Sequence, residues 1–258
     1  MRNIQQKKLN IFHEGAVSEA IGFLLIFSLV MMGIGLIILY GYPILLETQT
    51  NANVRNMERD MIVLQNDMKG LVYKNVPYKE TSLQVSGGSL AVHNYLTTIA
   101  FFTISNGTEL YNGTCGHLIY ESDAGEAIIA LENGAVLTRM EFQQGSAMLA
   151  EPRWFIDEIN GNKTFIITLM NISSDSVMSR NGIGTVKMRV IDSVFEQIAG
   201  TDMDVEVTYS NDITLNFAKA WENYFVNTLK MNKSGSNYTA SGIDNLVIKQ
   251  YNIKIISI

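Results

Sequence analysis

The strongest feature of the hydropathy pattern is one uninterrupted apolar segment near the N-terminus. Between Glu19 and Glu47 the chain runs for 27 residues without a charged side chain. About 20 apolar residues in a helix cross the hydrocarbon core of a bilayer, so this segment is long enough to span a membrane. The apolar region of a secretory signal is shorter, at about 7–15 residues, and no small-residue cleavage site follows this one. The pattern therefore predicts a transmembrane helix over residues 16–46 that stays in the protein.

A second helical pattern follows over residues 47–75. Apolar side chains recur there at alternating steps of three and four residues, which is the spacing of a narrow heptad seam. The seam residues are Val54, Met57, Met61, Leu64, Met68 and Leu71. Two interpretations stay open at this point. Either this stem helix lies on the protein's own outer domain, or its seam packs against the same helix in neighbouring copies.

The pattern changes again from Val76, where short alternating apolar runs are separated by turn dipeptides. Three of these dipeptides, Gly87-Gly88, Asn133-Gly134 and Asn160-Gly161, predict β-hairpins. Further strands are expected over 182–191, 202–210 and 245–258.

One amphipathic helix interrupts the strands at residues 217–229. Its apolar face carries Phe217, Trp221, Tyr224, Phe225 and Leu229. The fold class expected is α+β, with a long N-terminal transmembrane and stem helix followed by a β-rich, sandwich-like ectodomain over 76–258.

Charge sets the expected orientation in the membrane. Arg2, Lys7 and Lys8 precede the apolar segment, so residues 1–15 are predicted to form a cytoplasmic leader, with the C-terminal domain outside the cell. From Glu47 onward the chain has 16 basic and 23 acidic residues, a net charge of −7. This acidic balance argues against binding to nucleic acid and against docking on anionic lipid.

The start of the apolar segment resembles a known family. The motif "AVSEAIG" at Ala16–Gly22, followed by "FLLIFSLVMMGIGLIILYGYP", resembles the N-terminal segment of archaeal type IV pilin-like proteins. It is most similar to uncharacterised archaeal pilin-like membrane proteins with a single span. The resemblance is strong over about residues 15–95 and weak beyond.

The resemblance implies a class III signal that a prepilin peptidase cuts on the cytoplasmic side. Gly15 matches the residue before the cut, and Ala16 would become the new N-terminus. Two positions depart from the usual pattern: Glu14 stands where a lysine or arginine is common, and Glu19 replaces the common proline. Glu19 would lie near the position of the helix carboxylate of bacterial pilins, which is thought to pair with a neighbour's terminal amine. Alternatively, Glu19 marks the cytoplasmic interface and stabilises the helix N-terminus.

The outer part carries six N-x-Ser/Thr sequons, about twice the number expected by chance. A surface protein with candidate N-glycosylation sites fits this excess. The sequon asparagines are Asn106, Asn112, Asn162, Asn171, Asn232 and Asn237.

Residues typical of catalysis and metal binding are sparse. His93 and His117 do not stand at metal-ligand spacing, and Cys115 is close to His117 in sequence but is expected to be a buried free thiol. No catalytic or nucleotide-binding motif occurs. We expect no enzymatic activity, no cofactor, no bound metal and no small-molecule substrate.

These patterns support two functional hypotheses. The first is a pilin-like structural or adhesive protein of the cell surface, whose apolar helix anchors it in the membrane or self-associates in a filament core. The second is a solitary membrane-anchored ectodomain for binding or cell-envelope contact, with its leader uncleaved.

Overall fold

The computed structural model describes residues 11–74, 76–94, 100–123, 125, 127–140, 145–211 and 215–258 of the chain, with side chains from residue 18 onward. It divides into two compact units, residues 1–51 and 52–258, and each is described by itself. The second unit is called the β domain below. The expected leader falls largely on residues 1–10, which lie outside the described part.

The first unit contains the apolar helix. Helix α1 covers Ile11–Leu36, a π-helical turn (η1) covers Ile37–Gly41, and α2 covers Tyr42–Tyr73. Because Pro43 has no N–H to donate, the helix loses one backbone hydrogen bond in the turn before it, and η1 lies there. The helix from Ser18 on is long and apolar enough to cross a membrane, as its composition predicts.

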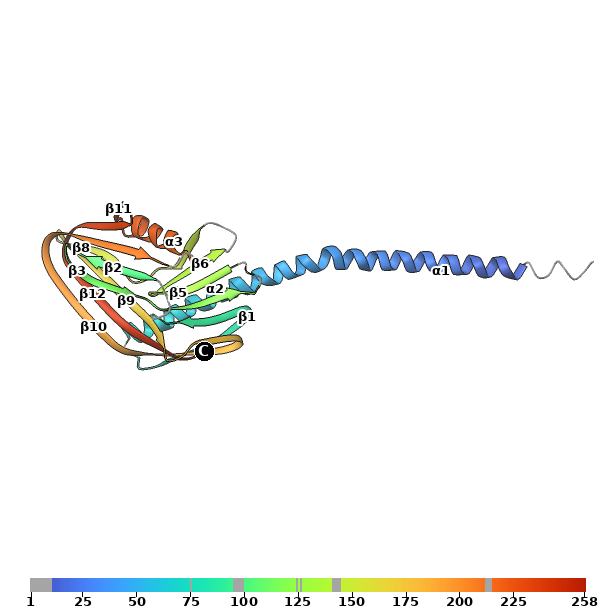
Figure 1. Ribbon diagram of the computed structural model, residues 1–258, viewed down its shortest axis with the longest axis horizontal. Helices are drawn as coiled ribbons and strands as arrows, with labels where there is room; N and C mark the ends of the chain where they lie inside the picture. The colour runs from blue at the N-terminus through green and yellow to red at the C-terminus, as the bar shows by residue number, and fades with distance from the viewer. Residues whose placement is uncertain are drawn as a thin grey trace, which may run out of the picture. The chain divides into compact units, whose positions relative to one another are not determined.

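Twelve described strands form one mixed sheet in the β domain (Figure 1). The strands run over Lys79–His93 (β1), Phe101–Ser105 (β2), Glu109–Thr114 (β3), His117–Ser122 (β4), Ala127–Glu132 (β5), Ala135–Met140 (β6), Ser146–Ala150 (β7), Phe155–Ile159 (β8), Asn162–Ser174 (β9), Met178–Ser210 (β10), Asn232–Ser234 (β11) and Asn237–Ser257 (β12). The main path is β7-β6-β5-β4-β1-β10-β12-β9-β8, while β2 joins β10 to β3 and β11 pairs with β12. Described neighbours pair antiparallel except β9 and β12, which are parallel.

The long strands β10 and β12 connect two separate hydrophobic cores. Val186 and Met188, early in β10, belong to a core that also contains the buried face of α2, whereas Val205 and Val207, late in the same strand, belong to an aromatic core around α3. Between these ends β10 follows a broad curve beside β12 (Figure 1). Strands β4, β5 and β6 contribute alternate residues to both cores.

The coarser expectation of an α+β fold with a β-rich domain is confirmed. A sandwich of two separate sheets is not confirmed, because hydrogen bonds join the described strands in one folded sheet.

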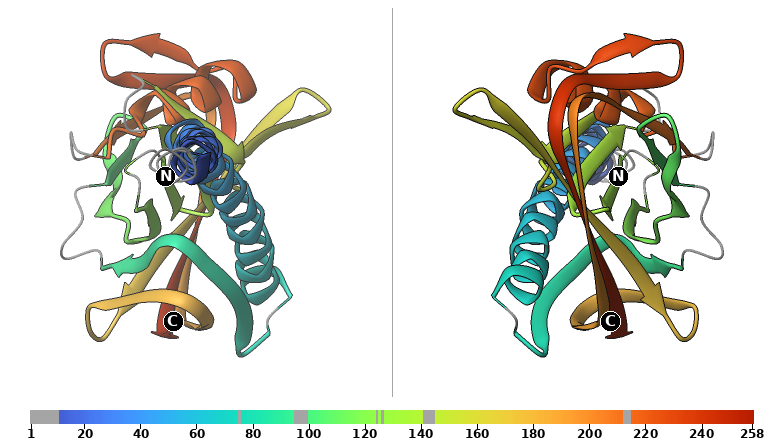
Figure 2. Two further views of the ribbon diagram at one scale, coloured as in Figure 1. Left: turned by 90° about the vertical axis from the view of Figure 1, so that its right-hand side faces the viewer. Right: turned by 90° about the vertical axis from the view of Figure 1, so that its left-hand side faces the viewer.

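The heptad seam of α2 lies in the first of these cores. Met61 and Met68 are fully buried, and Val54 is the most exposed seam residue at 5%. The seam shares this core with residues of β1, β4, β5 and β10 of its own chain, and the later turns of α2 lie beside β1 in both views of Figure 2. The interpretation that the seam packs against neighbouring copies is therefore corrected. Residues 52–73 also belong to the β domain rather than to a separate stem.

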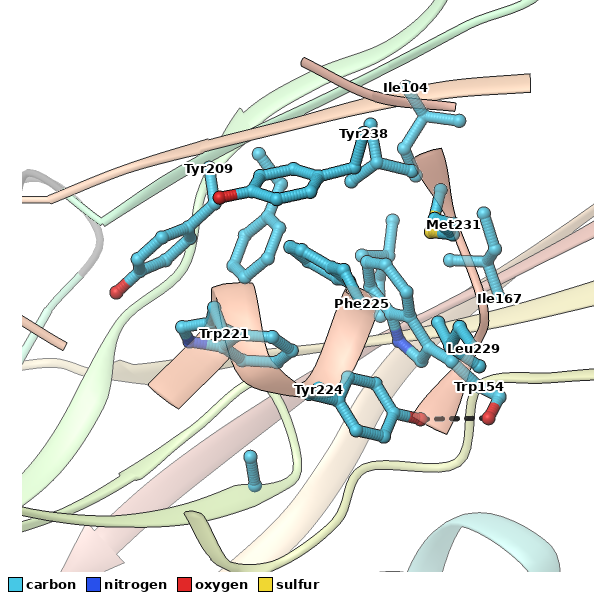
Figure 3. Close-up of a cluster of buried hydrophobic side chains, with 14 of the residues drawn as sticks. Ile104, Trp154, Ile167, Tyr209, Trp221, Tyr224, Phe225, Leu229, Met231 and Tyr238 are labelled. Atoms are coloured by element: carbon cyan, nitrogen blue, oxygen red, sulfur yellow. Dashed lines mark hydrogen bonds between the residues drawn. The ribbon is translucent and has the colours of Figure 1, made fainter. Parts of the chain in front are cut away.

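The second core is built around the predicted amphipathic helix. Residues Ala218–Asn223 form α3 and Tyr224–Thr228 form a π-helical turn (η2). Trp221 and Phe225 are fully buried and contact Trp154, with ring centroids 5.6–6.0 Å apart among the three (Figure 3). The hydroxyl of Tyr224 donates to the carbonyl oxygen of Trp154 at 2.8 Å, which ties the helix to the segment before β8.

Two of the three predicted hairpins are confirmed. Asn133-Gly134 joins β5 to β6 and Asn160-Gly161 joins β8 to β9, with positive φ at all four residues as the tight turn requires. The hairpin predicted at Gly87-Gly88 is wrong.

Instead of turning, the chain continues through this dipeptide as β1, and a register shift interrupts its pairing with β10 between Val85 and Leu90. Gly87 has a φ of +63°, so the two glycines form an irregularity within one strand. Similarly, the strands expected over 182–191 and 202–210 are two parts of β10. The predicted C-terminal strand is confirmed as part of β12.

Candidate functional site

The largest exposed apolar surface of the first unit is the helix from Ile21 to Leu46. Every large hydrophobic side chain in this range is exposed, with exposed fractions between 43% and 73%. An apolar patch on a soluble monomer rarely exceeds a few hundred Å², and each such side chain gains about 1.5–3 kcal/mol when it leaves water. This surface therefore requires an apolar environment, either lipid or other helices.

Polar groups within this helix are satisfied locally. The hydroxyl of Ser28 donates to the carbonyl oxygen of Leu24 at 2.7 Å, and that of Thr48 donates to Ile44 at 2.8 Å. Such bonds remove the cost of placing a hydroxyl in hydrocarbon. A Cβ added at Gly22, Gly33 or Gly35 would meet nothing within 4 Å, so these glycines leave the helix surface open.

The residues of the predicted processing site lie on α1. Gly15 and Ala16 are both within this helix, four and three residues, respectively, before the exposed side chain of Glu19. The seam residues, in contrast, lie in the core of the β domain. The processing site and the seam therefore belong to different units of the chain.

The sequon asparagines differ in their surroundings. Asn162 and Asn232 are exposed. Asn171 is engaged at both ends of its amide: its oxygen accepts from the backbone N–H of Gly116 at 3.1 Å, and its nitrogen donates to Asn252 at 3.1 Å. Asn106, Asn112 and Asn237 donate to Met203, Glu109 and Glu206, respectively. The six sequons therefore differ in how accessible their asparagine side chains are, although their sequence motif is the same.

A row of titratable residues crosses the sheet, and the sequence motifs do not reveal it. His93 on β1 pairs with His117 on β4, which pairs in turn with Glu132 on β5. The rings of the two histidines stack with centroids 5.2 Å apart. Because these residues are up to 39 positions apart in the sequence, only the strand register brings them together.

The carboxyl group of Glu132 is fully buried and joins α3 to the sheet. Its Oε1 accepts hydrogen bonds from Tyr209 and from the indole of Trp221, both at 2.9 Å. Its Oε2 has no hydrogen-bond partner among the described residues and lies 3.9 Å from Nδ1 of His117. Burial raises the pKa of Glu132 to about 7, although the two hydrogen bonds oppose this shift.

His117 shows the opposite shift. Burial, with a smaller contribution from His93, lowers the pKa of His117 to about 3, so its ring is neutral at physiological pH. Nearby, Cys115 is buried and forms no disulfide bond with another described residue, and burial raises its pKa well above the ordinary value. A thiol in this state is a poor nucleophile. Within the part of the chain that the structure describes, no three His, Cys, Asp or Glu residues form a group able to hold a metal ion.

Comparison with known proteins identifies a family but no described function. Residues 16–252 match a family of unknown function, DUF7289. The chain belongs to this family. The match includes the complete apolar helix and nearly all of the β domain, and it begins at Ala16. No curated protein and no solved structure gives a significant match.

Proposed function

We propose that this chain is a pilin-like structural or adhesive protein of the cell surface, whose apolar helix anchors it in the membrane or packs in a filament core. The observation that carries the proposal is the exposed apolar surface from Ile21 to Leu46. Lipid or a bundle of the same helices supplies the apolar environment that the surface requires.

Cleavage by a prepilin peptidase would determine whether the apolar helix stays in lipid or packs in a bundle of the same helices. The family resemblance marks the bond between Gly15 and Ala16 as the cut, and the family match also begins at Ala16. Cutting there removes the basic residues of the leader and leaves an amino group near Glu19. A carboxylate at the head of a membrane helix is costly unless a cation neutralises it, so the new amino group of a neighbouring copy is a suitable partner.

A second candidate function is a solitary membrane-anchored ectodomain, and two observations favour it. The seam from Val54 to Leu71 is buried in its own β domain and is not available to hold copies together. In addition, Glu14 stands where a processed leader usually carries a basic residue. In this case the leader remains, and the β domain contacts a ligand or the cell envelope as a single copy.

Mass spectrometry of the N-terminus, on protein isolated from its native membrane, tests the first proposal. We expect a chain that begins at Ala16, and electron microscopy should show the labelled protein in surface appendages. Gly15→Leu should block the cut because a large residue replaces the small one, whereas Gly15→Ala, which keeps a small residue, should be processed normally. An intact Met1 start without appendages contradicts the filament role and supports the solitary anchor.

A further inference from the structure

A groove of about 630 Å³ lies in the β domain between the end of α2 and the segment that follows β7. One wall is formed by residues on one face of α2 together with Lys74, the residue after the helix. The other wall is the segment 151–153. The first wall consists of Asn66, Lys69, Gly70, Tyr73 and Lys74. A Cβ added at Gly70 would meet nothing within 4 Å, so no protein atom fills the groove next to this residue.

Three cationic side chains line this groove, namely Lys69, Lys74 and Arg153. In the described part of the chain, none of them forms an ion pair. The carboxylate that lines the groove belongs to Glu151, and its Oε1 already accepts a hydrogen bond from Thr228 at 2.9 Å. The lining thus has three cations and one carboxylate, a net charge of +2, in a domain that is acidic as a whole.

Lys69 and Arg153 show how closely this charge is concentrated. The Nζ of Lys69 donates to the backbone carbonyl of Glu151 at 3.2 Å. Partial burial lowers the pKa of Lys69, and the neighbouring charge of Arg153 lowers it further, while the carboxylate of Glu151 opposes both effects. The guanidinium of Arg153 lies 4.4 Å from the ring centroid of Tyr73, and this cation–π contact holds it at the wall of the groove.

The position of Lys74 after the last turn of α2 also stabilises the negative end of the helix dipole. That effect does not account for Arg153, which comes from a different segment. The single carboxylate of Glu151 balances only one of the three cations, so they still repel one another, and a bound anion would relieve this repulsion.

We propose that this groove binds an oxyanion carried on a sugar, such as the carboxylate of an acidic surface polysaccharide. Lysine and arginine donors are suited to carboxylate and phosphate oxygens. The volume is in the range of sites that hold small organic ligands and is larger than a bare phosphate requires, which favours an anion on a larger carrier. The inference concerns the β domain alone and does not depend on whether the apolar helix assembles.

Calorimetric titration of the full-length chain in detergent micelles tests this inference, with a trimer of galacturonic acid, inorganic phosphate and a neutral galactose trimer as probes. We expect saturable binding of the acidic trimer that weakens as the salt concentration rises, and no binding of the neutral trimer. Arg153→Gln and Lys74→Gln should each weaken binding at least about tenfold, because each removes a charged hydrogen-bond donor to the ligand. The matched control is Arg55→Gln, an exposed arginine on α2 outside the groove, which should change the affinity less than about twofold.

Three results would overturn the inference. Absence of saturable binding for both anions would exclude an oxyanion site. An equal loss of affinity in Arg55→Gln and Arg153→Gln would show that general charge, rather than the groove, attracts the ligand. Phosphate binding as tightly as the acidic trimer would exclude the sugar carrier and assign the groove to the free anion. Unfolding temperatures of the variants close to that of the parent protein establish that the fold is retained.

Discussion

His117 and Glu132 lie directly opposite each other on β4 and β5, and both side chains are fully buried. Their nearest polar atoms, Nδ1 and Oε2, are 3.9 Å apart, and neither has a hydrogen-bond partner in the described part of the chain. Their pKa values shift towards the neutral form of each residue, to about 3 for His117 and about 7 for Glu132. Between about pH 3 and pH 7 both groups are therefore neutral and do not form an ion pair, because desolvation outweighs their mutual attraction.

These shifts have opposite effects on the pH dependence of stability. The folded state binds the proton of Glu132 more tightly than the unfolded state does, so the contribution of Glu132 is lost as the pH rises from about 4.5 through about 7. For His117 the unfolded state binds the proton more tightly, so stability is lost as the pH falls from about 6.5 towards about 3. Between about pH 4.5 and 6.5 the two slopes oppose each other.

Glu132→Gln should remove the loss of stability at high pH. Glutamine does not ionise, and its carbonyl oxygen can still accept from Tyr209 and Trp221. Because the pKa of Glu132 is raised from 4.5 to about 7, its contribution to the free energy of unfolding should fall by about 2–3 kcal/mol between pH 5 and pH 8. Denaturation of the full-length chain in detergent at both pH values measures this difference. Glu121→Gln, at an exposed position on β4, is the control, and an unchanged pH dependence in Glu132→Gln would contradict the assignment.

Met61→Asp should unfold the β domain rather than only prevent assembly. Met61 is fully buried against the sheet, and burying an unpaired charge there costs at least about 3 kcal/mol. Val63→Asp places the same charge on the same helix at a residue that is 51% exposed, and it should cost less than about 1 kcal/mol. Circular dichroism during denaturation compares the two variants. Equal stability of both variants would show that the seam does not support the domain.

Gly116→Ala should destabilise the junction before β4. A Cβ at Gly116 would clash with the carbonyl oxygen of Ile172, and it would lie 2.9 Å from that of His93. Overpacking of this kind costs about 1–3 kcal/mol. In contrast, Gly70→Ala meets open space within a helix and should stabilise the protein by up to about 1 kcal/mol. The free energies of unfolding of the two variants should therefore change in opposite directions, and a stable Gly116→Ala would show that the strands can separate there.

Glycosylation should distinguish Asn162 from Asn171 in protein isolated from its native membrane. Asn162 is exposed and its amide is accessible, whereas the amide of Asn171 is hydrogen bonded to Gly116 and Asn252. Glycopeptide mass spectrometry should find a glycan at Asn162 and none at Asn171. Asn162→Gln should then lower the apparent mass, and Asn171→Gln should not. A glycan on Asn171 would mean that modification precedes folding of β9.

Several features follow from local sequence because the interactions that determine them are local. The length of the apolar run between Glu19 and Glu47 is sufficient to predict a membrane-compatible helix. Asn133-Gly134 and Asn160-Gly161 predict their turns because both residues of such a turn need positive φ. The step of three and four residues in α2 also identifies its buried face correctly.

Other features depended on tertiary structure, since their partners are distant in the chain. The periodicity of α2 gives no information on what its seam packs against, and the core that it shares with β1, β4, β5 and β10 depends on long-range strand pairing. Gly87-Gly88 resembles a turn, yet pairing with β10 and β4 on either side keeps it within a strand. The buried pair of His117 and Glu132 likewise arises from strand register, which no local pattern specifies. Local composition thus determined the elements of this protein, whereas hydrogen bonding between distant strands decided which of their faces are buried.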